Sequence, residues 1–176
     1  MATRRAGGAA RAALRAGAGL VTVASPRDAL AVNAAALTAV MVRETETPKQ
    51  FGELLADKRL KACVIGPGAG IGERTREIVH AALSAHRGVV LDADALNQLS
   101  GDVEGWRWFL KRMGPTWITP HPQEFERLFP FCDQGSPLER AAAAAERSGA
   151  VVLLKGAHSV IADPSGSVRQ LVGTEC

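Results

Sequence analysis

The segment TPHPQEF places an imidazole and a carboxylate, His121 and Glu124, three residues apart and directly after an apolar run. An imidazole titrates near neutral pH and can move a proton or hydrogen-bond a polar ligand. Pro120 and Pro122 flank the histidine and restrict the loop, so the ring would lose little conformational entropy on binding. A single His with one Glu is not the two-His helix motif of zinc proteases. We therefore interpret His121 as a ligand contact, not an idle surface residue, and expect no metal here.

A second polar group follows another apolar run, in the segment LDADALN. It comprises Asp92, Asp94 and Asn97. Acids at the end of a strand can hold a cation, assist proton transfer or position a polar ligand. Asp94 is equally well placed to cap the short helix expected after it, whereas Asp92 is harder to explain as a cap.

Four glycines lie in the segment GPGAGIG, residues 66–72. Glycines allow a ligand to approach the backbone closely, and the N–H groups before a helix can meet an anion. The segment is not a dinucleotide fingerprint, because Ile71 and Glu73 occupy the places where the third glycine would fall, and no G-K-[ST] motif of a P-loop occurs. The alternative is a tight turn, but four glycines exceed what a turn needs, so we favour binding.

Lys155 ends the apolar run VVLLK and is followed by Gly156. An ammonium beside open backbone suits an anionic phosphate. A lone lysine at a strand end is as often simply solvated, so the residues themselves leave both interpretations open. The remaining histidines, His80, His86 and His158, fit exposed positions.

These groups all follow short apolar runs, which predict strands at 20–24, 62–66, 89–92, 116–119 and 151–155. Helical patterns separate most of them, at 8–17, 28–39, 73–85 and 136–149. The continuous apolarity indicates strands buried on both faces, and SVIAD, PSG and SVRQLV predict a hairpin. We expect an α/β fold with a mostly parallel central sheet, helices on both faces and a C-terminal β-hairpin at the edge. Ligands of such sheets bind beyond the carboxyl ends of the strands, where these polar groups would lie.

Composition narrows the class of protein further. The 176 residues are 47% hydrophobic and 22% charged, which favours one domain over residues 1–176 and excludes a disordered tail. The net charge is +3, yet 16 of the 21 basic residues are arginines scattered among 18 acids, so we expect no nucleic-acid partner. Apolar runs too short for a bilayer predict a cytoplasmic protein without a membrane partner. Three widely spaced cysteines, Cys63, Cys132 and Cys176, argue against a disulfide frame.

Five blocks taken together resemble one family over about residues 8–168: GAARAALRAGAGLVTVASP, VIGPGAG, VVLDADALN, ITPHPQEFERL and VLLKGAHSVIADPSG. In this order they are similar to the ADP- or ATP-dependent NAD(P)H-hydrate dehydratases, which are ribokinase-like proteins. The resemblance implies a lyase that repairs NADHX and NADPHX, hydrated forms of NADH and NADPH. The nucleotide phosphorylates the hydrate's hydroxyl, phosphate is eliminated, and Mg²⁺ assists. The Ala- and Arg-rich composition leans bacterial, which favours ADP over ATP.

The resemblance also assigns residues. Ala9, Gly70 and His121 match positions that contact the hydrated nucleotide, and Asp92, Asn97 and Glu124 would shape the floor of the site. The block that binds the adenine nucleotide matches Lys155, Gly156, Ala157, His158 and Ser159. Related dehydratases often form tetramers, so a homo-oligomer is expected.

The family pattern continues into a glycine-rich Gly-Asp segment that carries the catalytic Asp, whereas this chain ends at Cys176. It also has an opening strand upstream of the position of Gly8. We therefore expect an incomplete domain with no assigned catalytic residue, whose isolated chain binds but turns over poorly. Two alternatives stay open: a ribokinase-like kinase for a vitamin precursor, and a non-catalytic nucleotide-binding remnant. The segments TPHPQEF and DADALN favour the dehydratase.

Overall fold

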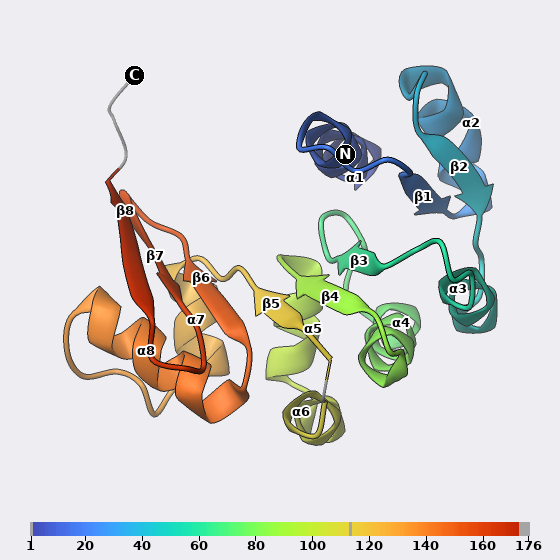
Figure 1. Ribbon diagram of the computed structural model, residues 1–176. Coiled ribbons are helices and arrows are strands. Elements are labelled where there is room, and N and C mark those ends of the chain that lie inside the picture. The colour runs from blue at the N-terminus through green and yellow to red at the C-terminus, as the bar shows by residue number, and fades with distance from the viewer. Residues whose placement is uncertain (1, 113, 173–176) are drawn as a thin grey trace.

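The computed structural model describes residues 2–112 and 114–172. Its main sheet has six strands in the order β3-β4-β5-β6-β7-β8 (Figure 1). The first four strands pair in parallel, and the last two add an antiparallel hairpin at the edge, which confirms the predicted mostly parallel sheet. The strands are β3 (Ala62–Ile65), β4 (Gly88–Leu91), β5 (Thr116–Ile118), β6 (Val151–Leu154), β7 (His158–Ala162) and β8 (Val168–Val172).

A row of apolar side chains in register crosses this sheet. Ile65 pairs with Leu91, Leu91 with Ile118, Ile118 with Val152, and Val152 with Ala162. Each member of the row is buried in the main core. Burial of a Leu, Ile or Val side chain contributes about 1.5 to 3 kcal/mol. A slip of one residue would move such side chains to the other face of the sheet, so the row favours the observed register.

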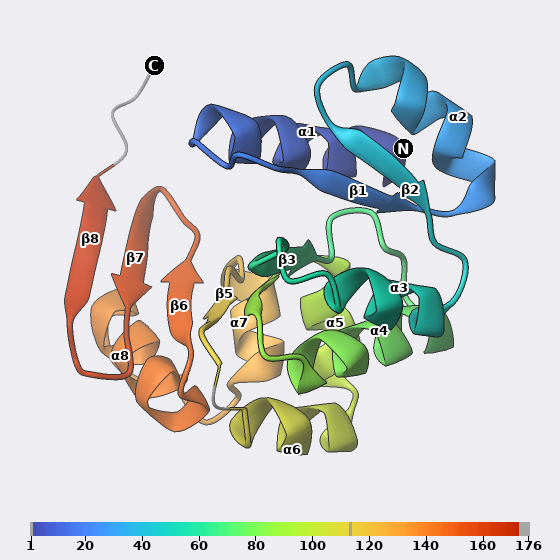
Figure 2. The same cartoon turned by 45° about the vertical axis from the view of Figure 1, so that its right-hand side comes forward.

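Helices cover the side of the sheet that carries this row. Figures 1 and 2 show α8 against the hairpin end of the sheet and α4 and α6 toward the other end. The helices that contribute to the main core are α3 (Pro48–Leu55), α4 (Glu73–Ser84), α5 (Asp94–Ser100), α6 (Val103–Leu110), α7 (Pro122–Leu128) and α8 (Pro137–Ser148). Across the part of the chain described, no helix is both long enough and apolar enough to span a membrane.

The predicted burial of every strand on both faces is wrong for β3 and β5. Val64 and Trp117 point away from the buried row, and they remain 55% and 43% exposed. Continuous apolarity in these strands therefore does not report coverage on both sides.

A smaller unit precedes the main sheet and lies beside β3 in both views (Figures 1 and 2). It consists of α1 (Ala2–Arg15), β1 (Thr22–Ser25), α2 (Arg27–Ala36) and β2 (Met41–Glu44). β1 and β2 form a separate two-stranded parallel sheet, with a small core of Ala10, Val23, Leu37 and Val40. The sequence did not indicate β2, α3 or this division. β2 reads MVRE and is mostly exposed, so it lacks the apolar signal of a buried strand.

The helix predicted at 136–149 is confirmed as α8, and both of its ends carry capping residues. Ser136 accepts from the backbone N–H of Glu139, whose carboxylate accepts from the N–H of Ser136, and Gly149 ends the helix in the left-handed conformation. Cys63 and Cys132 are free thiols, and Cys176 lies outside the described residues.

Candidate functional site

The carboxyl ends of β3, β4, β5 and β6 meet at one edge of the main sheet, and backbone hydrogen bonds continue past the strands. The Asp92 N–H donates to the Ile65 carbonyl at 3.0 Å, and the Thr119 N–H donates to Leu91 at 3.1 Å. The Lys155 N–H donates to the Pro120 carbonyl at 2.9 Å. The four segments that carry the predicted polar residues are therefore tied to one another by the backbone.

Asp92 and Lys155, which are 63 residues apart in the chain, form an ion pair at this edge. Lys155 Nζ lies 2.6 Å from Asp92 Oδ1. The side chain of Lys155 is 39% exposed and that of Asp92 is 26% exposed, so the pair contributes little to stability. It fixes where the ammonium lies while leaving it open to an incoming anion. Lys155 is thus a positioned cation and not merely a solvated strand end.

Gly66 brings the glycine loop against the chain that follows β4. A Cβ at this position would lie 1.6 Å from the Asp92 carbonyl oxygen, and the backbone φ is +129°. Both the space and the conformation require glycine. The loop and the Asp92 segment therefore approach as closely as two backbones can.

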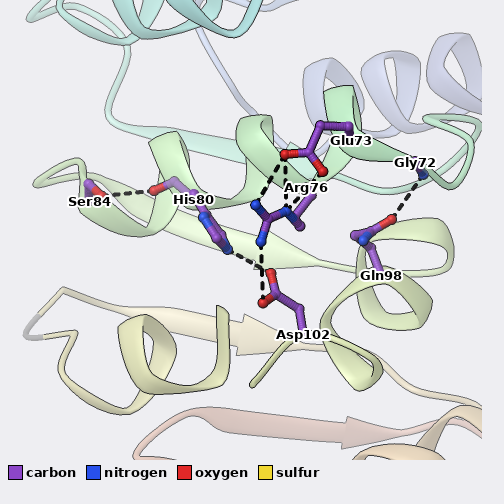
Figure 3. A network of polar contacts seen from close by, with 7 residues as sticks. All are labelled: Gly72, Glu73, Arg76, His80, Ser84, Gln98 and Asp102. Carbon is purple, nitrogen blue, oxygen red and sulfur yellow. Dashed lines mark hydrogen bonds and ion pairs between the residues drawn. The ribbon is translucent and has the colours of Figure 1, made fainter. Parts of the chain in front are cut away.

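Two N–H groups of the glycine loop already have side-chain acceptors. Gly70 donates to Asp94 Oδ2 at 2.9 Å. Gly72 donates to Gln98 Oε1 at 2.9 Å, the bond drawn in Figure 3. The prediction that this loop offers its amides to an anion is therefore not supported at Gly70 and Gly72. Nor does Asp94 cap α5: the N-cap residue is Ala93, and no side-chain capping bond forms there. The sequence did not indicate a role for Gln98, because a single glutamine in a helical segment is typical of an exposed helix surface.

His121 and Glu124 form a capping box at the start of α7. Glu124 Oε2 accepts from the His121 N–H at 2.9 Å, and His121 Nδ1 accepts from the Glu124 N–H at 3.4 Å. Glu124 is 4% exposed, whereas the imidazole of His121 is 44% exposed. The other ring nitrogen of His121, Nε2, lies 3.3 Å from Glu124 Oε1. The buried carboxylate thus holds both the loop and the ring, while the ring stays partly exposed. The sequence predicted that both residues follow a strand, but it did not indicate that they bond to each other.

Asn97 lies on α5, and its Oδ1 accepts from Arg127 of α7 at 2.7 Å. The residue therefore links two helices behind the strand ends. No signal in the sequence pointed to this contact, because Asn97 and Arg127 are 30 residues apart.

The remaining predicted residues lie at two places. Gly156 and Ala157 are exposed in the turn between β6 and β7, and His158 is exposed at the first position of β7. Ser159 donates to the Gly156 carbonyl at 3.5 Å. Ala9 lies on α1, in the smaller unit. The contacts in residues 2–112 and 114–172 join neither Ala9 nor His121 directly to the Lys155 side chain.

A second polar network lies away from these strand ends, on α4 (Figure 3). His80 Nε2 lies 2.7 Å from Asp102 Oδ2, and Arg76 lies between Glu73 and Asp102. The prediction that His80 is an exposed residue is wrong, because its side chain is 21% exposed and pairs with a buried acid. Within the described ranges, no three His, Cys, Asp or Glu side chains gather as a metal site would require.

Comparison with known proteins bears on this arrangement. A family model described as NAD(P)H-hydrate dehydratase matches residues 6–173. The bifunctional NAD(P)H-hydrate repair enzyme Nnr of Synechocystis sp. is 40% identical over 154 residues, which cover 85% of this chain and 29% of that protein. The enzyme of the same name from Moorella thermoacetica is 40% identical over 174 residues, which cover 91% and 32%.

Solved structures give the same result. The ADP/ATP-dependent NAD(P)H-hydrate dehydratase of Bacillus subtilis, co-crystallised with ATP/Mg²⁺, is 26% identical with a TM-score of 0.78, over 96% of this chain and 59% of that one. A ribokinase-like superfamily protein from Enterococcus faecalis, 22% identical with a TM-score of 0.79, shares the fold over 99% and 59%. The chain spans about a third of the two bifunctional relatives and about 60% of these structures. With a family match that extends over nearly all of its residues, the chain belongs to the NAD(P)H-hydrate dehydratase family.

Proposed function

We propose that this chain takes part in the ADP-dependent dehydration of NADHX and NADPHX to NADH and NADPH, as a lyase of nicotinamide nucleotide repair. The observation that carries the proposal is the ion pair between Lys155 and Asp92 beside the glycine loop. It provides a cation at the carboxyl edge of a parallel sheet, which is where this class of fold binds nucleotides. Family membership identifies the reaction to which such a site belongs.

The nucleotide half of the proposed site is the end of β6. Lys155 would bind a phosphate oxygen of ADP through its ammonium, which is half-exposed and already held in place. The turn that follows and the start of β7 would contact the rest of the nucleotide, through Gly156, Ala157, His158 and Ser159. ATP is the alternative phosphoryl donor, since a Bacillus subtilis dehydratase was co-crystallised with ATP/Mg²⁺.

The hydrate half would lie toward the glycine loop and α7. His121 presents a partly exposed imidazole, whose Nε2 would exchange its contact with Glu124 for a hydrogen bond to the hydrated ring or its hydroxyl. Gly70 would allow close approach of the nicotinamide, because nothing lies within 4 Å of the place its Cβ would take. Ala9 would complete the contact from the smaller unit.

Mg²⁺ would enter with the nucleotide. This ion is usually held by one or two carboxylates together with substrate phosphates, so a dedicated cluster of ligands is not needed. Asp92 is the carboxylate placed to face such a phosphate, because it already holds Lys155. When bound, the ion would neutralise phosphate charge. We propose a cytoplasmic homo-oligomer, with no membrane or nucleic-acid partner.

Binding tests this proposal most directly. Isothermal titration of the chain with ADP and, separately, with NADPH hydrate should show both ligands binding. Lys155→Ala should raise the Kd for ADP about tenfold, as loss of a charged hydrogen bond does. Lys58→Ala, which removes an exposed lysine elsewhere, is the matched control. A wild-type chain that ignores the hydrate but phosphorylates a thiazole or pyrimidine alcohol would make it a vitamin-precursor kinase instead.

A further inference from the structure

The short helix α5 touches both of the segments to which the hydrate contacts are assigned. Its polar residues Asp94, Asn97 and Gln98 are three and four positions apart, a spacing that places them on one face of a helix. The other face carries Ala95, Leu96 and Leu99, which are at most 1% exposed. The buried face anchors the helix in the main core, so its polar face is rigid.

One side of this polar face holds the glycine loop. The acceptors on Asp94 and Gln98 are one helical turn apart, and they take the N–H groups of Gly70 and Gly72, two residues apart. Both glycines have positive φ, at +76° and +145°, so the loop backbone has few intrinsic restraints. The first part of the loop is held by its own contacts, since the Ala69 N–H donates to Gly66 and Thr75 Oγ1 donates to Ala69. The two bonds from α5 fix the second part, at Gly70 and Gly72.

The other side holds α7. Asn97 accepts from Arg127, and α7 begins at its N-cap residue His121. α5 is therefore bonded to the loop with Gly70 and to the helix that positions His121. The Lys155 ammonium pairs with Asp92, and within residues 2–112 and 114–172 no contact joins it to a side chain of this face.

We propose that the polar face of α5, made of Asp94, Asn97 and Gln98, positions Gly70 and His121 relative to each other and thereby determines affinity for the hydrated nicotinamide nucleotide. The inference rests on the proposed function, since it assumes that these two residues contact the hydrate. In this inference, Asp94 and Gln98 are positioning residues for the hydrated nicotinamide nucleotide. The site for the adenine nucleotide should not depend on them.

The test compares two ligands across matched variants. Asp94→Ala and Gln98→Ala remove the acceptors, whereas Asp94→Asn and Gln98→Glu keep an acceptor oxygen. Misplacement of a contact by about 1 Å can cost up to a hundredfold, and we expect each alanine variant to raise the Kd for NADPH hydrate about tenfold. The Kd for ADP should change less than about twofold, and the conservative variants should restore hydrate binding.

Asp163→Ala is the control. Asp163 also accepts from backbone N–H groups, those of Ser165 and Ser167, but in the turn between β7 and β8. It should leave both affinities unchanged. Amide hydrogen exchange by NMR adds a readout without ligand: the Gly70 amide should exchange faster in Asp94→Ala, and the Gly72 amide faster in Gln98→Ala.

Three results would overturn the inference. If the alanine variants bind the hydrate as the wild type does, α5 does not determine this affinity. If they lose ADP and the hydrate equally, α5 is only a structural support. A wild type that binds ADP but not the hydrate would contradict the proposed function, and the inference with it.

Discussion

At the scale of single residues, His121 has two separable roles, as the cap of α7 and as an accessible imidazole. His121→Asn keeps a good N-cap but removes the ring, whereas His121→Ala removes both. We expect both variants to raise the Kd for NADPH hydrate about tenfold and to leave the Kd for ADP nearly unchanged. Only the alanine variant should lose about 1 kcal/mol of unfolding free energy, because it alone removes the cap. Titration calorimetry and urea unfolding measure the two effects. Equal loss of both ligands would mean that the loop is structural.

Cys63 predicts how stability depends on alkaline pH. Burial raises the pKa of its thiol from 9.0 to about 11, and nearby Arg112 opposes part of this shift. An unfolded chain releases this proton at lower pH than the folded chain does. The contribution to stability is therefore complete below about pH 9 and is lost as the pH rises through about 11.

Replacement of Cys63 isolates this contribution. Cys63→Ala should flatten the fall in unfolding free energy between about pH 9 and 11, measured by urea unfolding across the range. Ser84→Ala, an exposed change on α4, should leave the wild-type slope. Parallel curves for Cys63→Ala and the wild type would contradict the assignment.

At the scale of elements, the guanidinium of Arg112 binds the carboxyl end of α4. Arg112 donates to the carbonyls of Ala82, Leu83 and Ala85 at 3.0, 2.5 and 2.8 Å, and also to that of Arg87. A cation at the carboxyl end of a helix satisfies carbonyls that have no partner within the helix. Arg112 is thus the cap of α4 and ties the helix to the strand that follows.

Removal of this cap should be costly. Arg112→Met removes the guanidinium from the carbonyls of Leu83 and Arg87, whereas those of Ala82 and Ala85 keep a backbone N–H donor. We expect it to reduce the free energy of unfolding by about 2 to 4 kcal/mol in urea titrations. Arg112→Lys should recover only part of the loss, because an ammonium has fewer donors than a guanidinium. Arg59→Met removes an exposed arginine paired with Asp57 and should not move the midpoint. An unchanged midpoint in Arg112→Met would contradict this role.

The elements also show how far the sequence alone can lead. Strands of the main sheet were predictable because their buried positions are apolar, and α8 because both of its ends carry capping residues. β2 was not, since a mostly exposed strand of four residues has no such signal. The candidate site divides in the same way. Its residues follow the strands, as predicted. Lys155 can reach Asp92 because β6 lies two strands away from β4, with β5 between them. This strand order cannot be inferred from local sequence.

At the scale of the whole molecule, two cores of unequal size predict unequal stability. The smaller core has four buried residues, and a two-stranded sheet is marginal without other support. Backbone amides of β1 and β2 should therefore exchange by partial opening, while those of β4 exchange only on global unfolding. Val23→Ala should speed exchange in β1 and β2 alone, measured by native-state hydrogen exchange. Equal acceleration in β4 would show that the two cores unfold together.

The contact at Gly66 has a consequence for which sequences this fold can accept. Two conditions exclude a side chain at position 66: the positive φ and the Asp92 carbonyl. At position 70 only the positive φ disfavours a side chain. In a saturation library selected for folding, codon 66 should return glycine alone. Codon 70 should also return asparagine, which enters the left-handed region more readily than most residues. The two positions of this loop should therefore accept substitutions at different rates during evolution, with position 66 constant and position 70 variable.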